Sequence, residues 1–222
     1  ASRPIAHIEG IKGAGMTRIA ILKTGAPPLS LIGPHGDYPA MFRTLLGTGY
    51  ETWTFDCQAG DWPDAGAFDA AIITGSAAGV YEPDPWIGDL LAWIRAAKGR
   101  TGLIGVCFGH QALAQALGGR VEKSDRGWGV GLHRYDVVSA EPWMDPGAAA
   151  VAIPASHQDQ VVEAPAGARI TLKSAFTPVA GLAWDKDAIS LQGHPEFTPA
   201  YAAALTEGRR DRIGESATDR AL

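Results

Sequence analysis

The sequence predicts a doubly wound α/β fold, in which helices cover both faces of a mostly parallel β-sheet. Short apolar runs typical of buried strands alternate with amphipathic helical patterns through the first half of the chain. This alternation indicates βαβ units, whose strands pair in parallel. The second half carries short strands separated by Gly and Pro, without helical patterns between them. These strands predict hairpin or meander additions to the parallel core.

The elements of the first half follow from where apolar residues recur. Four strands are expected, at residues 18–23, 50–55, 68–74 and 102–106. Helices are expected over residues 38–46, from Asp84 or Asp89 onward, and over residues 110–117. In these helices apolar side chains recur every three or four residues, which is the spacing of one helix face.

The second half is expected to extend the sheet. Five short strands are expected, at residues 129–138, 149–153, 168–174, 179–184 and 188–192. A last helix is expected from Pro199 through Leu205 toward Arg209, and the polar tail beyond Ile213 is expected to fray. The predicted fold is therefore a flavodoxin-like sheet with antiparallel strands added in its second half.

Length, composition and charge limit the classes of function. A chain of 222 residues with 46% hydrophobic residues buries a full core. Residues 1–15 lack the apolar segment of a secretory signal and precede Met16. We interpret them as a vector-derived leader, and residues 16–222 as a single domain. A net charge of −5 gives no basic surface for nucleic acid or for an anionic membrane, and no apolar stretch is long enough to span a bilayer.

The two cysteines, Cys57 and Cys107, differ in their surroundings. With no export signal, both are expected to be reduced thiols of a cytoplasmic protein, and Cys57 is interpreted as structural. Cys107 lies in Gly105-Val106-Cys107-Phe108-Gly109, between a predicted strand and a predicted helix. This G-x-C-x-G segment has the form of a nucleophile elbow, which exposes the thiol at the carboxyl end of a strand. The helix that follows favours the thiolate through its dipole and free N–H groups.

A cysteine nucleophile needs a base, and His194 is the best candidate among six histidines. It lies in Gly193-His194-Pro195-Glu196 after a predicted strand, where residues two apart face the same way. Glu196 is therefore placed to orient the imidazole, although a surface turn with an unremarkable His and Glu is the alternative. The other five are interpreted as leader, loop, packing, strand or turn residues: His7, His35, His110, His133 and His157.

Four segments in this order resemble the class I glutamine amidotransferases, the cysteine-triad glutaminase domains of the synthetases for GMP, carbamoyl phosphate and anthranilate. They are the elbow with His110-Gln111, the Gly193–Glu196 segment, the glycine-rich stretch Ile72–Glu82, and Ser156-His157-Gln158-Asp159, which is closest to the GMP-synthase branch. The resemblance extends from Arg18 to about Leu205.

The resemblance implies a catalytic triad of Cys107, His194 and Glu196, in agreement with the reading of the residues themselves. It also implies an oxyanion hole formed by the backbone N–H groups of Ser76 and Phe108. Four further residues are expected at the substrate: Gly75, Gln111, Trp128 and Gly129. One departure concerns the oxyanion loop, which usually reads G-G-P in the family and here reads Gly75-Ser76-Ala77.

The expected activity is hydrolysis of the γ-amide of glutamine through a cysteine thioester, with release of ammonia to a separate synthetase subunit. Two alternatives stay open: a γ-glutamyl peptidase acting on other γ-glutamyl compounds, and an inactive homologue that serves as a binding or regulatory subunit. Neither a metal nor a cofactor is expected, because the cysteines have no CxxC partner and no acidic or histidine ligand cluster is evident.

Overall fold

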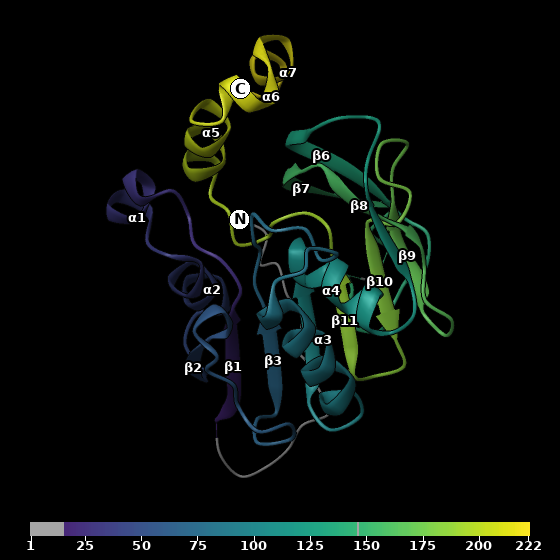
Figure 1. Ribbon diagram of the computed structural model, residues 1–222. Helices are drawn as coiled ribbons and strands as arrows, with labels where there is room; N and C mark the ends of the chain where they lie inside the picture. Colours follow the sequence, from purple (N-terminus) through teal and green to yellow (C-terminus); the bar gives the residue numbers. More distant parts are fainter. Residues whose placement is uncertain (1–15, 146) are drawn as a thin grey trace.

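The computed structural model describes residues 16–145 and 147–222, and its centre is a nine-stranded mixed sheet (Figure 1). The strand order is β2-β1-β3-β4-β11-β10-β9-β6-β7. Five strands form the parallel part: β1 (Thr17–Lys23), β2 (Tyr50–Asp56), β3 (Ala70–Ile73), β4 (Gly102–Val106) and β11 (Ala188–Leu191). Four antiparallel strands extend it: β10 (Gly181–Trp184), β9 (Arg169–Lys173), β6 (Gly129–Val137) and β7 (Ala150–His157). The prediction of a parallel core with antiparallel additions is confirmed.

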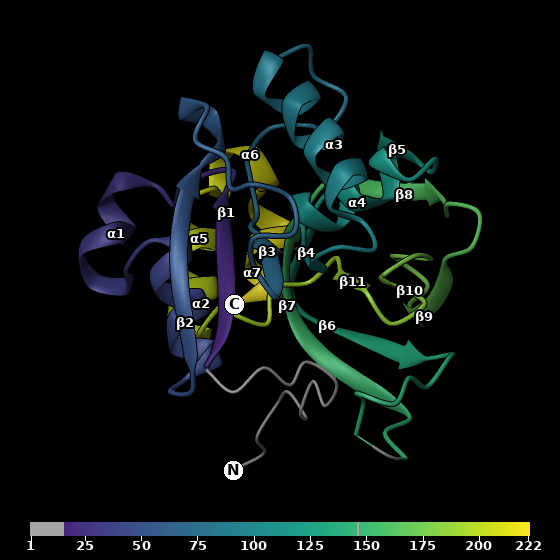
Figure 2. The same ribbon diagram turned by 90° about the horizontal axis from the view of Figure 1, so that it is seen from below.

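Helices cover both faces of the parallel strands. Along β1, Ala20 and Leu22 face the apolar cluster that includes residues of α3 (Pro85–Ala97) and α4 (Phe108–Ala116). The alternate residues Ile19 and Ile21 instead pack with Phe42 of α2 (Tyr38–Leu46). Figure 2 shows these helices on opposite sides of β1 and β3. The period of two along a strand therefore separates two apolar layers around one sheet.

Besides the short 3₁₀ helix η1 (Cys57–Ala59) and the tail, three elements lie outside the sequence prediction: α1 (Leu29–His35), β5 (Arg120–Lys123) and β8 (Asp159–Glu163). The α1 helix has no buried residue and contains Pro34, so it carries no apolar periodicity that would reveal it. β5 and β8 pair only with each other, in a short antiparallel ribbon. His157 is the last residue of β7 and is buried, whereas the sequence predicts a turn there.

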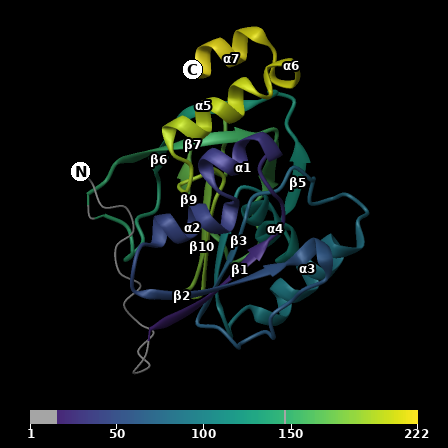
Figure 3. The ribbon, with the colours of Figure 1, turned by 90° about the vertical axis from the view of Figure 1, so that its left-hand side faces the viewer.

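The expectation that the tail beyond Ile213 frays is wrong. The predicted last helix divides into α5 (Pro199–Glu207) and α6 (Arg210–Ile213), and the tail forms α7 (Glu215–Ala221). The α7 helix packs against β6 and α5, and its Thr218 is fully buried (Figure 3). A side chain at Gly131 of β6 would lie 3.0 Å from Ala221, so the tail lies directly on the sheet. The polar composition of α7 conceals this contact in the sequence.

The parallel strands place their carboxyl ends at one edge of the sheet. In the register of β1, β3, β4 and β11, the chain leaves these strands at Thr24, Thr74, Cys107 and Gln192. Ligands of open α/β sheets bind in the crevice outside this edge. The topology therefore brings the predicted elbow and the segment of His194 to neighbouring positions. Within the described residues, no helix has both the length and the apolar character needed to cross a membrane.

His110 joins α4 to the added strands and is fully buried. Its Nε2 lies 3.1 Å from the carbonyl oxygen of Val179, and its Nδ1 lies 2.8 Å from the hydroxyl of Ser190. The carbonyl only accepts, so Nε2 carries the hydrogen and the Ser190 hydroxyl donates to Nδ1. Burial lowers the pKa of His110 to about 4, and the imidazole is neutral at pH 7.

We expect His110 to make folding sensitive to acid. Between the ordinary pKa of 6.5 and the folded value of about 4, the unfolded chain binds a proton that the folded chain does not. The free energy of unfolding therefore decreases as the pH is lowered through this window. In His110→Gln this dependence is expected to be shallower by up to about 1.4 kcal/mol per pH unit in that window. Urea titrations from pH 7 to 4.5 measure the slope, and parallel curves for the two proteins would contradict this assignment.

Candidate active site

Cys107 links β4 to α4 in a backbone conformation that side chains rarely adopt. Its φ is 53° and its ψ is −103°, and such a conformation costs about 1–3 kcal/mol. Two backbone hydrogen bonds hold it: the Cys107 amide donates to Leu191 O (2.9 Å), and Cys107 O accepts from the Gln111 amide (3.1 Å). The first ties the elbow to β11, and the second begins α4. The predicted elbow is thus observed as a strained turn.

The two flanking glycines are required by close contacts rather than by their own φ angles. A Cβ on Gly105 would lie 2.4 Å from Gly109 O, and a Cβ on Gly109 would lie 2.2 Å from Ile73 O. Both targets are backbone atoms, which have no freedom to move aside. The helix α4 therefore packs against β3 and β4 at a distance that admits no side chain at either position.

His194 is fixed on three sides. Its Nδ1 donates to Glu196 Oε1 at 2.8 Å, and both side chains are almost completely buried. Its backbone amide donates to Pro154 O at 2.7 Å, and its ring stacks on Phe197 with centroids 3.9 Å apart and planes 7° apart. Because the carboxylate only accepts, Nδ1 carries the hydrogen, and Nε2 is left for chemistry. The alternative of a surface turn is excluded by this burial.

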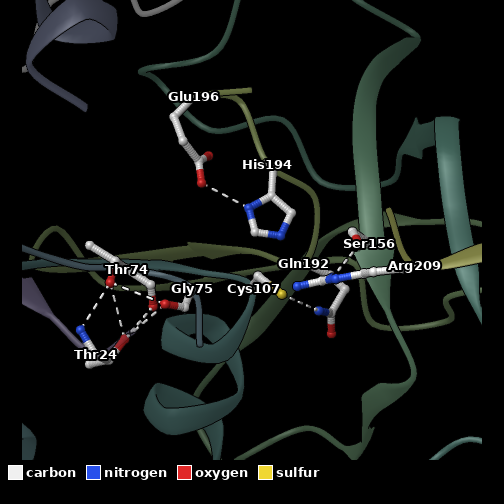
Figure 4. Close-up of polar contacts among 9 residues, drawn as sticks. All are labelled: Thr24, Thr74, Gly75, Cys107, Ser156, Gln192, His194, Glu196 and Arg209. Carbon is white, nitrogen blue, oxygen red and sulfur yellow. Dashed lines mark hydrogen bonds and ion pairs between the residues drawn. The ribbon is translucent and has the colours of Figure 1, made fainter. Parts of the chain in front are cut away.

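Cys107 and His194 meet at the glycine-rich loop that follows β3 (Figure 4). A Cβ built on Gly75 would lie 3.0 Å from His194 Cε1 and 3.9 Å from Cys107 Cβ, so both side chains border this one residue. Thr24 holds the loop: its amide donates to the Thr74 hydroxyl (3.0 Å), and its hydroxyl donates to Thr74 O (2.9 Å). The loop, the thiol and the imidazole thus come from three neighbouring strand ends.

The electrostatics of the pair favour a charged imidazole. Burial by itself lowers the pKa of His194, but the adjacent Cys107 and Glu196 oppose it with their charges and hydrogen bonds, and together raise the pKa to about 10. The imidazole is therefore charged at pH 7, which places a positive charge beside the Cys107 sulfur. A thiolate is the reactive form of cysteine, so this arrangement fits a nucleophile. Burial raises the pKa of Cys57 to about 12, as expected for a structural thiol.

Gln192 is a residue that the sequence reasoning missed. It is fully buried, and its Nε2 donates to Cys107 Sγ at 3.7 Å. Its Oε1 accepts from Gln111 Nε2 (3.3 Å), which also donates to Asp159 O (2.9 Å). An amide donor aimed at the sulfur stabilises the thiolate. The signal was present in the sequence, since Gln192 lies two residues before His194 and leaves the same strand end.

A pocket opens beside the thiol. Its lining includes Ser76, Cys107, Gln111 and Trp128, four of the residues predicted for the site. The segment Ser156–Asp159 lines it as well, with the Asp159 carboxylate accepting from Tyr81 Oη at 3.1 Å. Phe108 is the first residue of α4, so its N–H has no acceptor within the helix. These placements are compatible with an oxyanion hole formed by the Ser76 and Phe108 amides.

Gly129 is not brought into this pocket. It begins β6 and faces an aromatic cluster, where an added Cβ would lie 2.7 Å from Phe176 and 2.9 Å from His157. Its absent side chain thus serves packing, and its predicted contact with substrate stays a prediction. Among residues 16–145 and 147–222, no group of three or more His, Cys, Asp or Glu has an arrangement suited to a metal ion.

The family model described as "Glutamine amidotransferase class-I" matches residues 43–205 of the chain. The chain belongs to this family. The matched segment contains the elbow, the glycine-rich loop and the His194–Glu196 pair, so the family assignment and the geometry concern the same residues. The predicted resemblance is confirmed, and the protein is an enzyme of the class I glutamine amidotransferases.

Relatives of the chain carry three kinds of name. A glutamine amidotransferase-like protein of Schizosaccharomyces pombe is 29% identical over 81% of this chain and 79% of its own length. Gamma-glutamyl peptidase 4 of Arabidopsis thaliana is 29% identical over 73% of this chain and 69% of its own. The GMP synthase of Dehalococcoides mccartyi is 35% identical, over 56% of this chain and 23% of its own.

The fold matches solved structures. A glutamine amidotransferase from Thermotoga maritima superimposes with a TM-score of 0.73, over 93% of this chain and 90% of its own, at 18% identity. That likeness supports the fold, in which a flavodoxin-like core carries extra antiparallel strands.

We expect Gly109→Ala to lower the free energy of unfolding by about 3 kcal/mol, because its Cβ would overlap the backbone of Ile73. Gly88→Ala is the matched control, since Gly88 lies exposed in α3 with no atom within 4 Å of an added Cβ. That change is expected to raise stability by up to about 1 kcal/mol. Urea denaturation measures both, and equal effects would contradict the steric argument.

We expect Gln192→Leu to weaken the thiolate. Loss of the donor at the sulfur is expected to slow alkylation of Cys107 by iodoacetamide at pH 7 by roughly 10-fold, because the thiolate is the form that reacts. Cys57 does not interfere, because its pKa of about 12 keeps it protonated at pH 7. Gln115→Leu, a change on α4 with no hydrogen bond to the sulfur, is the control. Equal alkylation rates for the two variants would contradict a role of Gln192 at the sulfur.

Proposed function

We propose that the protein hydrolyses γ-glutamyl amides through a thioester on Cys107. One observation carries the proposal: a sulfur on a strained elbow lies beside an imidazole whose far nitrogen is held by Glu196 at 2.8 Å. Nucleophile, base and orienting carboxylate are the three parts of a hydrolytic triad. The family of the chain and the names of its gamma-glutamyl peptidase and GMP synthase relatives support the same substrate class.

The proposed reaction runs in two halves. The Cys107 thiolate attacks the γ-carbonyl carbon, and the amides of Ser76 and Phe108 donate to the developing oxyanion. The carbon–nitrogen bond then breaks as His194 gives its Nε2 proton to the departing ammonia or amine. In the second half, His194 takes a proton from water as that water attacks the thioester. Glutamate leaves, and the thiolate is restored.

The oxyanion loop is the part of this proposal that departs from the family pattern. Each oxyanion donor contributes on the order of 3 kcal/mol at the transition state, so the sequence Gly75-Ser76-Ala77 matters for rate. A backbone N–H is supplied by any residue except proline, and Ser76 keeps it. Gly75 lies beside both His194 and Cys107, which supports a role for this loop in the proposed site.

Two leaving groups fit the proposal. With glutamine the product is ammonia, and the enzyme would act beside a separate synthetase subunit, as the likeness to GMP synthases supports. With a γ-glutamyl peptide the product is an amino acid or peptide, and coverage favours this candidate. The match to gamma-glutamyl peptidase 4 covers 73% of this chain, against 56% for the GMP synthase. The two free thiols fit the expected cytoplasmic location.

We expect Cys107→Ala to abolish hydrolysis of both glutamine and γ-glutamyl peptides. Glu196→Gln is expected to lower kcat by roughly 10²- to 10⁴-fold, because an amide no longer holds the imidazole in one tautomer or stabilises its cation. Ammonia and amine release are the measurements, and Cys57→Ala is the control that keeps full activity.

A γ-glutamyl diazoketone should add its mass at Cys107. Turnover by Cys107→Ala at the wild-type rate would refute the proposal, and a Cys107 that stays unlabelled would favour an inactive binding subunit.

A further inference from the structure

Two arginines line the same pocket as Cys107 and play no part in the proposed chemistry. Arg209 immediately precedes α6, and Arg212 lies within it. Both fall after residue 205, where the match to the family model ends. Figure 4 shows Arg209 extending toward Ser156 in the neighbourhood of Gln192 and Cys107. The pocket is thus completed by a stretch of chain that the family pattern does not describe.

These arginines are held in place without being neutralised. Arg209 Nη1 donates to Ser156 Oγ at 2.8 Å, and both guanidinium groups lie over the ring of Trp128, at 6.0 Å for Arg209 and 5.6 Å for Arg212. Among the described residues, neither has a carboxylate within ion-pair distance. Their neighbour Arg210 differs, because it pairs with Glu207, Glu215 and Asp219.

A pair of arginines with unused donors favours a carboxylate ligand. A guanidinium offers up to five N–H donors in a planar fork, and a carboxylate accepts two of them in parallel. Arg209 is half-buried, so its charge is less screened than one in open solvent. The acidic side chain in the described lining of the pocket is that of Asp159, whose Oδ2 already accepts from Tyr81. The two arginines therefore have no carboxylate partner among the described residues, and a substrate carboxylate could take that place.

We propose that Arg209 and Arg212 bind a carboxylate on the leaving-group side of a γ-glutamyl peptide. This inference rests on the proposed function. The γ-glutamyl part is shared by the substrates that the relatives' names imply, whereas the leaving group differs between glutamine and a peptide. Residues outside the family match are suited to read the part that differs. Glutamine releases ammonia and has nothing to place there, but a γ-glutamyl amino acid carries a carboxylate on its departing half.

The test compares two substrates that differ by that charge alone, γ-glutamylglycine and γ-glutamylglycinamide, with glutamine as the third. The wild-type kcat/KM is expected to favour the carboxylate by roughly 10- to 100-fold, the range of a charge-assisted hydrogen bond. In the double variant Arg209→Gln/Arg212→Gln, this ratio is expected to fall to near 1, with turnover of the glycinamide unchanged. Arg220→Gln is the control, since Arg220 is exposed in α7 and donates to Ser216.

A second variant guards against loss of structure. Arg212→Gln alone changes an exposed side chain, so it is expected to fold and to lose part of the preference. An unchanged ratio in both variants would overturn the inference, as would equal losses on all three substrates. The latter would place the arginines at the shared γ-glutamyl end. A wild-type ratio near 1 would refute the inference alone, whereas no hydrolysis of any compound would refute the proposed function and this subsite with it.

Discussion

The site depends on one backbone constraint, the positive φ of Cys107 at the end of β4. A chain that turns this sharply from strand to helix brings the helix against the sheet within a distance that only glycine tolerates at positions 105 and 109. As a result, the Cys107 sulfur lies beyond the strand ends at the start of a helix, and the dipole of that helix favours a negative charge on the sulfur. Every other part of the site is arranged around that sulfur.

The junction between the parallel and antiparallel parts of the sheet positions His194, the proposed base. β11 pairs in parallel with β4 and antiparallel with β10, so it belongs to both halves. The hydrogen bond from the Cys107 amide to Leu191 O fixes the register between the elbow and the end of β11. Gln192 and His194 leave that strand end and reach the thiol, and His194 also borders Gly75 of the glycine-rich loop. The antiparallel extension thus positions the acid–base group as well as enlarging the core.

The sequence predicted the parts whose chemistry is local. The elbow and the His194–Glu196 pair are encoded within a few residues, so strand and turn rules indicated both, and the family resemblance joined them into a triad. Elements held by tertiary contacts were missed: α1 has no buried face, and α7 is polar although Thr218 and Ala221 lie against the sheet. Gln192 and Arg209 escaped for a related reason. Their roles arise from which side chains the fold places beside them, Cys107 in one case and Ser156 with Trp128 in the other.

Arg209 and Arg212 lie in a different part of the chain from the proposed catalytic groups, so proposed substrate selectivity and proposed catalysis are encoded in separate segments. The bond-breaking groups lie between residues 75 and 196, inside the shared family segment, while the two guanidinium groups belong to a terminal stretch anchored through α7 on β6. Under the two proposals above, exchange of the segment after residue 205 between homologues would alter which substrates are selected and leave the acyl-transfer machinery intact.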